Sequence, residues 1–568
     1  MLARILSVAA VAAVAVTAWP EPRASAQAPA AAGPAITFTD VTSAAGIRFR
    51  HTNGAFGKKY LPETMGSGVV IFDADGDGDQ DLFLANGRSW PGQPAAGVPA
   101  SALPAFYRNN GTGGFVETTK AAGLAVSMYG MGGAAADYDN DGDTDLFTTG
   151  LDGNHLFRNG GAGVFTDATA ASGLASSTGF ATSAAWFDYD KDGILDLFIV
   201  NYVTWSIATD KTCSLDGTNK SYCTPEAYKG ASPVLYKGGK DGGFTDVTKA
   251  AGLADPQAKA LGIVLIDYNA DGWLDLFVAN DTRPNRLYRN TGKGGFVDEA
   301  VTAGVAFNDA GVPRAGMGAD AADYDGSGRA SLVVGNFTNE MIALYHNEGD
   351  GLFIDEAPGS AIGPASMPTL TFACLFLDVD LDGRPDILAA NGHVADDISK
   401  VQPKTQHAQS PHLFRNLGSK RFEVISGKVG PAFQQAVVAR GAAYGDLDGD
   451  GDLDIVLTEN NGPVRYLRND GGNRQKWLRV ALKGTKSNRS GIGAVVTATL
   501  PGGAKRWAMV KSGSSYLSQS ELPVTFGLGA DARVAGLEVR WPGGGVDTIG
   551  AVEANRTVTI VEGQGLVK

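Results

Sequence analysis

The chain has 568 residues, of which 77 are glycine and only 19% are charged, and its formal net charge is −14 at pH 7. This acidity argues against a nucleic-acid partner, because such a partner selects a basic protein face. Abundant glycine without a collagen period favours many short strands joined by tight turns.

The N-terminus has the features of a secretory signal peptide over residues 1–26. Arg4 precedes an apolar run from Ile5 to Ala18, and Ala24-Ser25-Ala26 offers a small-residue cleavage site. The run is shorter than the roughly 18 to 20 residues that a spanning helix needs, so a retained anchor is the weaker alternative. We therefore expect a secreted or periplasmic protein with an Ala/Pro-rich leader at 27–35 and no membrane span after signal cleavage.

Seven aspartate-rich loops organise residues 36–472. The first, Asp73–Asp81, reads D-A-D-G-D-G-D-Q-D, with carboxylates at positions 1, 3, 5 and 9 and glycine at position 6. A short apolar run typical of a strand follows each loop, and this recurrence indicates repeat architecture. The loops begin at Asp73, Asp137, Asp188, Asp267, Asp323, Asp378 and Asp446.

The loops have the chemistry of cation sites. Oxygen ligands at every second residue, wrapped round a glycine turn, suit a hard divalent cation. Without a cation, so many like charges would raise one another's pKa values. An EF-hand is the main alternative, but it needs glutamate at position 12, where the first three loops have Leu84, Thr148 and Ile199. Magnesium fits less well than calcium, because it resists exchanging its waters for an all-protein cage.

We therefore predict about five to six structural calcium sites, with ligands at positions 1, 3, 5, 7 and 9 of six loops and position 7 contributing only its carbonyl. These residues are Asp73, Asp75, Asp77, Asp79 and Asp81; Asp137, Asp139, Asp141, Asp143 and Asp145; Asp188, Asp190, Asp192, Ile194 and Asp196; Asp267, Asn269, Asp271, Trp273 and Asp275; Asp378, Asp380, Asp382, Arg384 and Asp386; and Asp446, Asp448, Asp450, Asp452 and Asp454. In the fifth loop Ser327 and Ser331 replace two carboxylates. We expect weak or no metal there, with Arg329 partly replacing it.

Each unit contains four strand-sized pieces. After the strands that enter and leave the loop come an aromatic-Arg-Asn strand, such as 287–290, and a Phe-x-Asp strand, such as 296–298. Four short strands repeated seven times predict an all-β fold with a seven-bladed β-propeller at 36–472. The seventh unit lacks its own Phe-x-Asp strand, and Phe38–Thr42 stands spare at the front. We infer that this segment completes the last blade and closes the ring.

Residues 473–568 break the repeat and predict a small C-terminal β-sandwich-like domain. Turn signals such as Trp541-Pro542-Gly543 separate its strands. We expect six strands, at 477–483, 493–500, 506–511, 524–528, 537–541 and 557–561.

The chain contains three cysteines. Cys213 and Cys223 lie ten residues apart in a polar insertion, and an oxidising compartment would permit a disulfide between them. Cys374 lies in an apolar run and is predicted to be a buried, inert thiol.

These motifs resemble known families. The D-x-D-x-D-G-x-x-D loops with the D-L-F and L-Y-R-N-x-G runs are similar to the FG-GAP/VCBS repeats of integrin-like propellers, over residues 36–470. That resemblance implies calcium bound between adjacent strands of a blade. The segments 484–493, 512–520 and 526–529 resemble the ASPIC/UnbV domain. Together the two regions resemble bacterial relatives of the cartilage acidic protein family, which implies extracellular calcium binding and interaction rather than an agreed reaction.

Two functions remain open at this point. The first is a secreted, calcium-stabilised scaffold for binding or adhesion, whose ligand is an unknown protein or glycan. The second is an extracytoplasmic enzyme that processes a glycan or a secondary metabolite on a propeller face. Its candidate groups are His51, Glu63, Asp281 and His393, for which loop hydrogen bonding is the competing explanation. No catalytic motif such as G-x-S-x-G or H-E-x-x-H occurs, so the scaffold is favoured.

The two functions predict different geometry. In an enzyme a histidine and a carboxylate of this set should converge in one pocket, whereas in a scaffold they should be dispersed. The insertion 202–228, with Trp205, is either a recognition loop or a lid.

Overall fold

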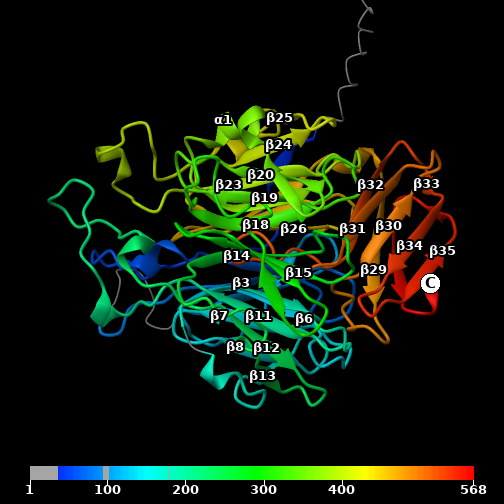
Figure 1. Ribbon diagram of the computed structural model, residues 1–568, viewed down its shortest axis with the longest axis horizontal. Helices are drawn as coiled ribbons and strands as arrows, with labels where there is room; N and C mark the ends of the chain where they lie inside the picture. Colours follow the sequence, from blue (N-terminus) through cyan, green and yellow to red (C-terminus); the bar gives the residue numbers. More distant parts are fainter. Residues whose placement is uncertain (1–35, 94–101, 178, 568) are drawn as a thin grey trace, which may run out of the picture. The chain divides into compact units, whose positions relative to one another are not determined.

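The computed structural model describes residues 36–93, 102–177 and 179–567, so the expected signal peptide and leader lie outside the described residues. From Phe38 to Asn469 the chain forms seven four-stranded antiparallel sheets, which are the blades of a β-propeller (Figure 1). The predicted all-β propeller fold is therefore confirmed. Among the described residues the longest helix is α1 (Ile362–Ser366).

Six blades use four consecutive strands, ordered from the centre outward. They are β2 (Val69–Phe72), β3 (Asp81–Leu84), β4 (Ala105–Asn109) and β5 (Phe115–Glu117); β6 (Gly130–Ala136), β7 (Asp145–Gly150), β8 (His155–Asn159) and β9 (Phe165–Asp167); β10 (Ala181–Phe187), β11 (Asp196–Asn201), β12 (Val234–Gly238) and β13 (Phe244–Asp246); β14 (Ala260–Ile266), β15 (Asp275–Asn280), β16 (Arg286–Asn290) and β17 (Phe296–Asp298); β18 (Gly316–Ala322), β19 (Ser331–Asn336), β20 (Ala343–Gly349) and β21 (Leu352–Asp355); and β22 (Thr371–Leu377), β23 (Asp386–Asn391), β24 (His412–Asn416) and β25 (Phe422–Val424).

The seventh blade joins the two ends of the ring. It pairs β26 (Ala439–Gly445), β27 (Asp454–Glu459) and β28 (Arg465–Asn469) with β1 (Phe38–Asp40), and Phe38 lies opposite Asn469. The inferred closing strand is confirmed. It gives the last blade an outer strand from the opposite end of the repeat region, so the edge of β28 is covered.

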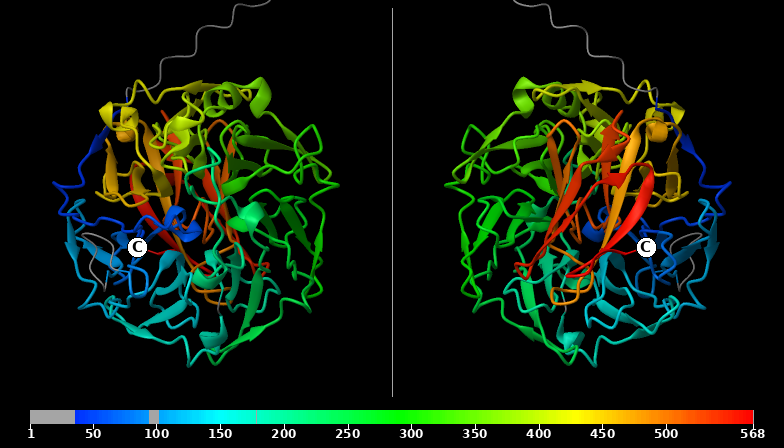
Figure 2. Two further views of the ribbon diagram at one scale, coloured as in Figure 1. Left: turned by 90° about the vertical axis from the view of Figure 1, so that its left-hand side faces the viewer. Right: turned by 90° about the vertical axis from the view of Figure 1, so that its right-hand side faces the viewer.

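Burial explains the composition of the strands. The first strand of each blade contacts the first strands of both neighbours, and these strands surround the centre of the ring (Figure 2). Strand β6 reads Gly-Met-Gly-Gly-Ala-Ala-Ala and is buried throughout, as are β14 and β22, which carry larger apolar residues. The outermost strands show one buried aromatic followed by exposed residues, as in β9.

The C-terminal region forms two four-stranded sheets that pack as a sandwich, with the orders β32-β29-β37-β38 and β31-β30-β34-β35, and a short β33-β36 pair. The six expected strands are present, and β33, β35, β36 and β38 were not anticipated because they are only two to four residues long. The strands are β29 (Lys476–Lys483), β30 (Val495–Thr499), β31 (Lys505–Met509), β32 (Val524–Gly529), β33 (Arg533–Val534), β34 (Gly536–Arg540), β35 (Val546–Ile549), β36 (Val552–Glu553), β37 (Arg556–Val561) and β38 (Gly565–Val567).

One segment of this sandwich, Ser512–Glu521, enters the centre of the propeller, and we call it the channel segment. Ser515 exchanges backbone hydrogen bonds with Ala319 of blade five, at 2.7 and 3.1 Å. The Gln519 side chain bonds both backbone groups of Ala135 in blade two, each at 3.0 Å. The Leu517 carbonyl lies so close to the inner strands that a Cβ at Gly68 or at Gly132 would fall 2.1 Å from it. The channel segment of the C-terminal domain therefore fills the centre of the propeller ring.

Replacing Phe38 tests the closing strand. The Phe38 ring is fully buried and its centroid lies 5.1 Å from that of Phe433, so Phe38→Ala should lower stability by about 3–5 kcal/mol through the cavity it leaves. Val116, 62% exposed on the outer strand β5, is the matched control, and Val116→Ala should change stability by less than about 0.5 kcal/mol. Chemical denaturation measures both. Equal effects of the two variants would contradict a closing role for β1.

Candidate metal centres

The aspartate loops connect the first and second strands of each blade, at the end of the ring that faces the C-terminal domain. Four loops bring the carboxylates of positions 1, 3 and 9 together, with one oxygen of each lying within 4.8 Å of the others. These triads are Asp73, Asp75 and Asp81; Asp137, Asp139 and Asp145; Asp188, Asp190 and Asp196; and Asp378, Asp380 and Asp386.

Backbone amides hold the triads in place. In the second loop Asp145 accepts from Asn159 N at 2.7 Å with one oxygen and from Tyr138 N at 3.1 Å with the other. Asp137 accepts from the amide of Gly142, at position 6, at 2.8 Å. The same bonds recur in the other loops, so the position-9 carboxylate also ties the loop to the third strand of its blade.

The backbone explains why glycine is invariant at position 6 and absent from some loops at position 4. At position 6 the φ angles run from 83° to 107°, which L side chains rarely adopt. Position 4 also has positive φ, but at values near the left-handed helical region, such as 59° at Asn140 and 52° at Leu381. Side chains are tolerated at position 4 and excluded at position 6.

The electrostatics of these loops fit a cation. Burial raises the pKa of Asp145 to about 9 and that of Asp137 to about 7, even though backbone N–H groups oppose the shift. Asp75, Asp190, Asp380 and Asp448, all at position 3, each have a buried oxygen without a hydrogen-bond partner among the described residues. A buried carboxylate oxygen in that state is costly unless a charge or a donor meets it. The donor set is oxygen throughout, which suits calcium.

Positions 5 and 7 are placed differently. The position-5 carboxylates lie outside the triads and accept from the position-7 amide, as Asp141 does from Asp143 N at 3.1 Å. Among the position-7 side chains, Asp452 is fully buried and burial raises its pKa to about 8. The assignment of positions 5 and 7 as ligands stays a prediction.

The fourth and fifth loops depart from the pattern. Asn269 uses its amide oxygen to accept from Asp271 N at 3.0 Å. In the fifth loop Asp325 is paired with the His346 ring, 2.8 Å from Nε2, while Arg329 Nε donates to the Asn347 carbonyl. Asp325 of this loop is therefore bonded to the His346 ring, and a role for Arg329 in place of a metal stays a prediction. His346 occupies the place that Arg or Lys holds in the equivalent strand of the other blades, which is the sequence signal that was available.

His346 also belongs to a cluster with Glu348 and Glu356 whose ligand atoms lie within 4.8 Å of one another. Lys420 Nζ lies within this cluster, 2.7 Å from Glu356 and 3.1 Å from His346 Nδ1.

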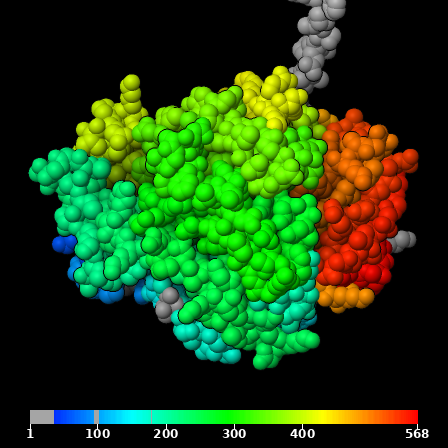
Figure 3. Space-filling view, viewed as in Figure 1, coloured from blue at the N-terminus to red at the C-terminus, as the bar shows by residue number. Residues whose placement is uncertain are grey.

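The C-terminal domain covers the loops. Ser490 Oγ accepts from Asp137 N at 2.9 Å, and Arg506 Nη2 donates to the Asp382 carbonyl at 2.9 Å. In Figure 3 the domain, drawn in orange and red, lies against the green part of the propeller. The second and sixth loops therefore lie at an interface within the chain.

The asparagine of the aromatic-Arg-Asn strand joins neighbouring blades, a role that the sequence did not reveal. Asn290 Nδ2 of blade four donates to the Tyr189 carbonyl in the loop of blade three, at 2.8 Å, and Asn416 of blade six reaches the Tyr324 carbonyl of blade five at 2.7 Å. Asn109, Asn159, Asn347 and Asn469 make the corresponding bonds, and blade three has Gly238 at this place. Recurrence of the asparagine was visible in sequence, but its partner in the next blade was not.

The polar groups considered for catalysis lie at the opposite end of the ring. Glu63 accepts from Trp90 Nε1 and Tyr222 OH, each at 3.1 Å, and Asp281 accepts from Tyr202 OH at 2.6 Å. Burial raises the pKa of both carboxyls to about 7. Among the described residues no hydrogen bond or ion pair joins His51 or His393 to either carboxyl.

The polar insertion lies at this same end of the ring. It carries the expected Cys213–Cys223 disulfide, and Cys374 is a buried free thiol as expected. Trp205 packs near Trp90, with the ring centroids 5.4 Å apart.

Comparisons with known families agree with this architecture. The family model for FG-GAP-like repeats matches residues 73–148, 137–199, 267–334 and 323–389, and the model for ASPIC and UnbV matches residues 484–567. The fold and the loops thus define a β-propeller of FG-GAP-like repeats followed by an ASPIC/UnbV domain.

Individual relatives are similar to this chain over most of its length. Cartilage acidic protein 1 of mouse is 26% identical over 367 residues, 64% of this chain and 51% of the relative, and the human protein gives 26% over 369 residues, 64% and 50%. The Xenopus tropicalis protein is 25% identical over 510 residues, 87% and 72%. The chain is distantly similar to cartilage acidic protein 1 and spans about half the length of the mouse and human relatives.

Solved structures share the propeller only loosely. An Agrocybe aegerita lectin specific for non-reducing terminal N-acetylglucosamine is 15% identical, with a TM-score of 0.37, and covers 70% of this chain and 87% of its own. The BP39L lectin of Burkholderia pseudomallei is 10% identical, with a TM-score of 0.42, and covers 72% of this chain and 99% of its own.

Within the described residues, no helix combines the length and hydropathy that a membrane crossing requires.

The pH dependence of the metal-free protein follows from the raised pKa values. An unfolded aspartate has a pKa of about 3.9, so folded values of about 7 to 9 at Asp137, Asp275 and Asp145 mean that the folded chain holds more protons up to that range. The free energy of unfolding of the metal-free protein must then fall as pH rises through these folded pKa values, about 7 to 9. The melting temperature in chelator should be lower at pH 8.5 than at pH 6.5 by about 5 °C.

Two comparisons control this measurement. Buried His51 and His393 have pKa values lowered to about 3 and 4, so their contribution changes only below about pH 6.5. Excess calcium should remove or reverse the trend, because a metal binds the deprotonated carboxylates. A melting temperature in chelator that rises across this window would contradict the electrostatic account of the loops.

Proposed function

We propose that the protein is a calcium-binding β-propeller that acts outside the cytoplasm as a scaffold for binding or adhesion. The observation that supports it most is the set of four aspartate triads, in three of which the position-3 carboxylate keeps an unpartnered oxygen. Calcium at these loops would supply the missing positive charge and fix the interface with the C-terminal domain. The N-terminal sequence supports a secreted or periplasmic location, and the ligand would be a protein or a glycan.

A structural role for the ions suits this geometry better than a catalytic one. The loops lie at an interface with the second domain, and their backbone is fixed by its own amides. At the other end of the ring, Glu63 and Asp281 bond to tryptophan and tyrosine groups rather than to a histidine. An acid–base pair within hydrogen-bonding reach, which an enzyme would need, is not formed by these residues.

Metal analysis tests the proposal directly. The purified protein should contain about five to six calcium ions per chain. Excess chelator should lower the melting temperature by about 10 °C or more, because each site filled at a hundred times its Kd adds about 2.7 kcal/mol. One ion or none per chain, with no change on chelation, would rule the proposal out.

Asp448→Asn separates metal binding from loop packing. Asp448 is half-buried, and burial together with Asp450 raises its pKa, so neutralising it should not lower the melting temperature in chelator. With calcium the variant should bind one ion fewer and lose about 2–3 kcal/mol relative to the parent chain. Asp241→Asn is the matched control, since Asp241 lies in an exposed turn and asparagine keeps its acceptor oxygen. Loss of stability in chelator as well as in calcium would point to packing instead.

A further inference from the structure

A basic side chain on the third strand of a blade contacts the aspartate loop of the same blade. In blade two Arg158, on β8, lies 2.7 Å from Asp139 Oδ2 through its Nε, and its Nη2 donates to Asp141 Oδ2 at 2.9 Å. Asp139 and Asp141 occupy positions 3 and 5 of the loop. One guanidinium therefore joins a carboxylate of the triad to a carboxylate outside it.

The same pairing recurs around the ring. In four blades the basic residue of the third strand forms an ion pair with the position-3 carboxylate, and these are the blades that carry the four triads described above. The pairs are Arg108 with Asp75, Arg158 with Asp139, Lys237 with Asp190 and Arg415 with Asp380. A cation bound at a triad would share its position-3 carboxylate with this base.

The two oxygens of the shared carboxylate are used differently. Asp75 Oδ2 accepts from Arg108 Nη1 at 3.1 Å, and Asp190 Oδ2 contacts Lys237 Nζ. The other oxygen, Oδ1 of Asp75 and of Asp190, is buried and has no hydrogen-bond partner in the part of the chain that the structure describes. A buried carboxylate is costly to keep charged unless a positive charge lies near it. In the metal-free loop the third-strand base supplies that charge.

Blade four departs from the pattern in the way that such a role requires. Position 3 of its loop is Asn269, which carries no charge. The third-strand base of this blade, Arg289, lies 2.7 Å from Glu299 instead. Where the loop lacks the position-3 carboxylate, the base is therefore bonded elsewhere.

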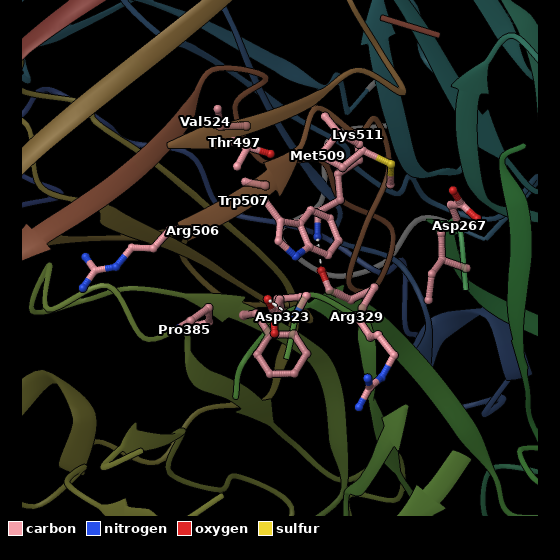
Figure 4. Close-up of a pocket in the computed structure, with 18 of the residues that line it drawn as sticks. Asp267, Asp323, Arg329, Pro385, Thr497, Arg506, Trp507, Met509, Lys511 and Val524 are labelled. Atoms are coloured by element: carbon pink, nitrogen blue, oxygen red, sulfur yellow. Dashed lines mark hydrogen bonds between the residues drawn. The ribbon is translucent and has the colours of Figure 1, made fainter. Parts of the chain in front are cut away.

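Blade five is the opposite extreme. Its loop keeps carboxylates only at positions 1 and 3. Asp325, at position 3, lies 2.8 Å from Nε2 of the third-strand residue His346, and the Trp507 indole points toward Asp323, at position 1 (Figure 4). Groups of the chain thus lie beside both carboxylates that this loop retains.

We propose that the third-strand base competes with calcium for the position-3 carboxylate, so that it stabilises the empty loop and lowers the calcium affinity of the filled one. In the empty loop the base offsets the mutual repulsion of the aspartates. Filling the site places a second positive charge at the same carboxylate, and repulsion between the two charges opposes binding. The residues in this role are Arg108, Arg158, Lys237 and Arg415. This inference rests on the proposed calcium binding and names residues that set its strength.

The test uses the full mature chain with the triple substitution Arg108→Met, Arg158→Met and Lys237→Met. Methionine keeps an unbranched side chain and removes the charge and the strong donors. Equilibrium dialysis against buffered calcium gives the affinity of the sites, and melting temperatures are recorded in chelator and in excess calcium. Each of the three affected sites should bind calcium about fivefold more tightly, the upper end for a partly exposed ion pair. The melting temperature should fall in chelator and match that of the parent chain in excess calcium.

Arg289→Met is the matched control, because Arg289 has the same place in blade four and a similar exposure, 32% against 29% for Arg108. It should leave the calcium affinity unchanged. Weaker or unchanged calcium binding by the triple variant would overturn the inference, since a base that only positions its carboxylate would strengthen binding. An equal gain per substitution in Arg289→Met would overturn it as well.

The same samples separate this inference from the proposed function. A parent chain without calcium would refute the proposed function, whereas a full calcium content with no gain in affinity on substitution would refute the competing role alone. If the triple variant does not fold in chelator, the single variant Arg158→Met carries the comparison with Arg289→Met.

Discussion

Buried carboxylate charge is the constraint on which the rest of the structure depends. Each blade turns from its first strand to its second through a loop with up to five aspartates, and burial raises the pKa values of Asp145, Asp275 and Asp452 to about 8 or 9. A chain that placed such groups there without a counter-charge would keep them protonated or lose stability. The loop sequence, the glycine at position 6 and the oxygen-only donor set are all consistent with a cation as that counter-charge.

The same loops hold the blades and the second domain together. The carbonyl at position 2 of a loop accepts the asparagine amide of the next blade, as Tyr189 accepts from Asn290. The other side of the loops meets the C-terminal domain, whose channel segment enters the centre of the ring. A change in loop geometry therefore reaches the neighbouring blade and the second domain at once. Chelation is expected to weaken contacts far from any one ion for this reason.

The blades, the closing strand Phe38–Asp40 and the second domain could be predicted from sequence, because repeats carry the same local pattern seven times and a missing strand can be counted. Three features could not. The channel segment and the contact of Trp507 with blade five join residues far apart in the sequence, such as Ala135 and Gln519, which are 384 positions apart, and no local pattern specifies such a contact. Asn290 and His346 were visible as residues, but their partners lie across a blade boundary or a strand pair. Periodicity predicts what each unit does alone and leaves the contacts between units open.

The fifth aspartate loop departs from the repeat, and it is also a loop that contacts the C-terminal domain through Trp507. Four loops keep a triad of carboxylates whose oxygens lie within 4.8 Å of one another, an arrangement that suits a cation. The fifth loop has lost two carboxylates, its Asp325 lies 2.8 Å from His346 Nε2, and its Asp323 faces an indole supplied by the other domain. At such a break in an otherwise consistent pattern, contacts to other parts of the chain have replaced the local one. Blade five is therefore joined to the C-terminal domain through Trp507 and to its own third strand through His346, at the place where other loops carry further carboxylates.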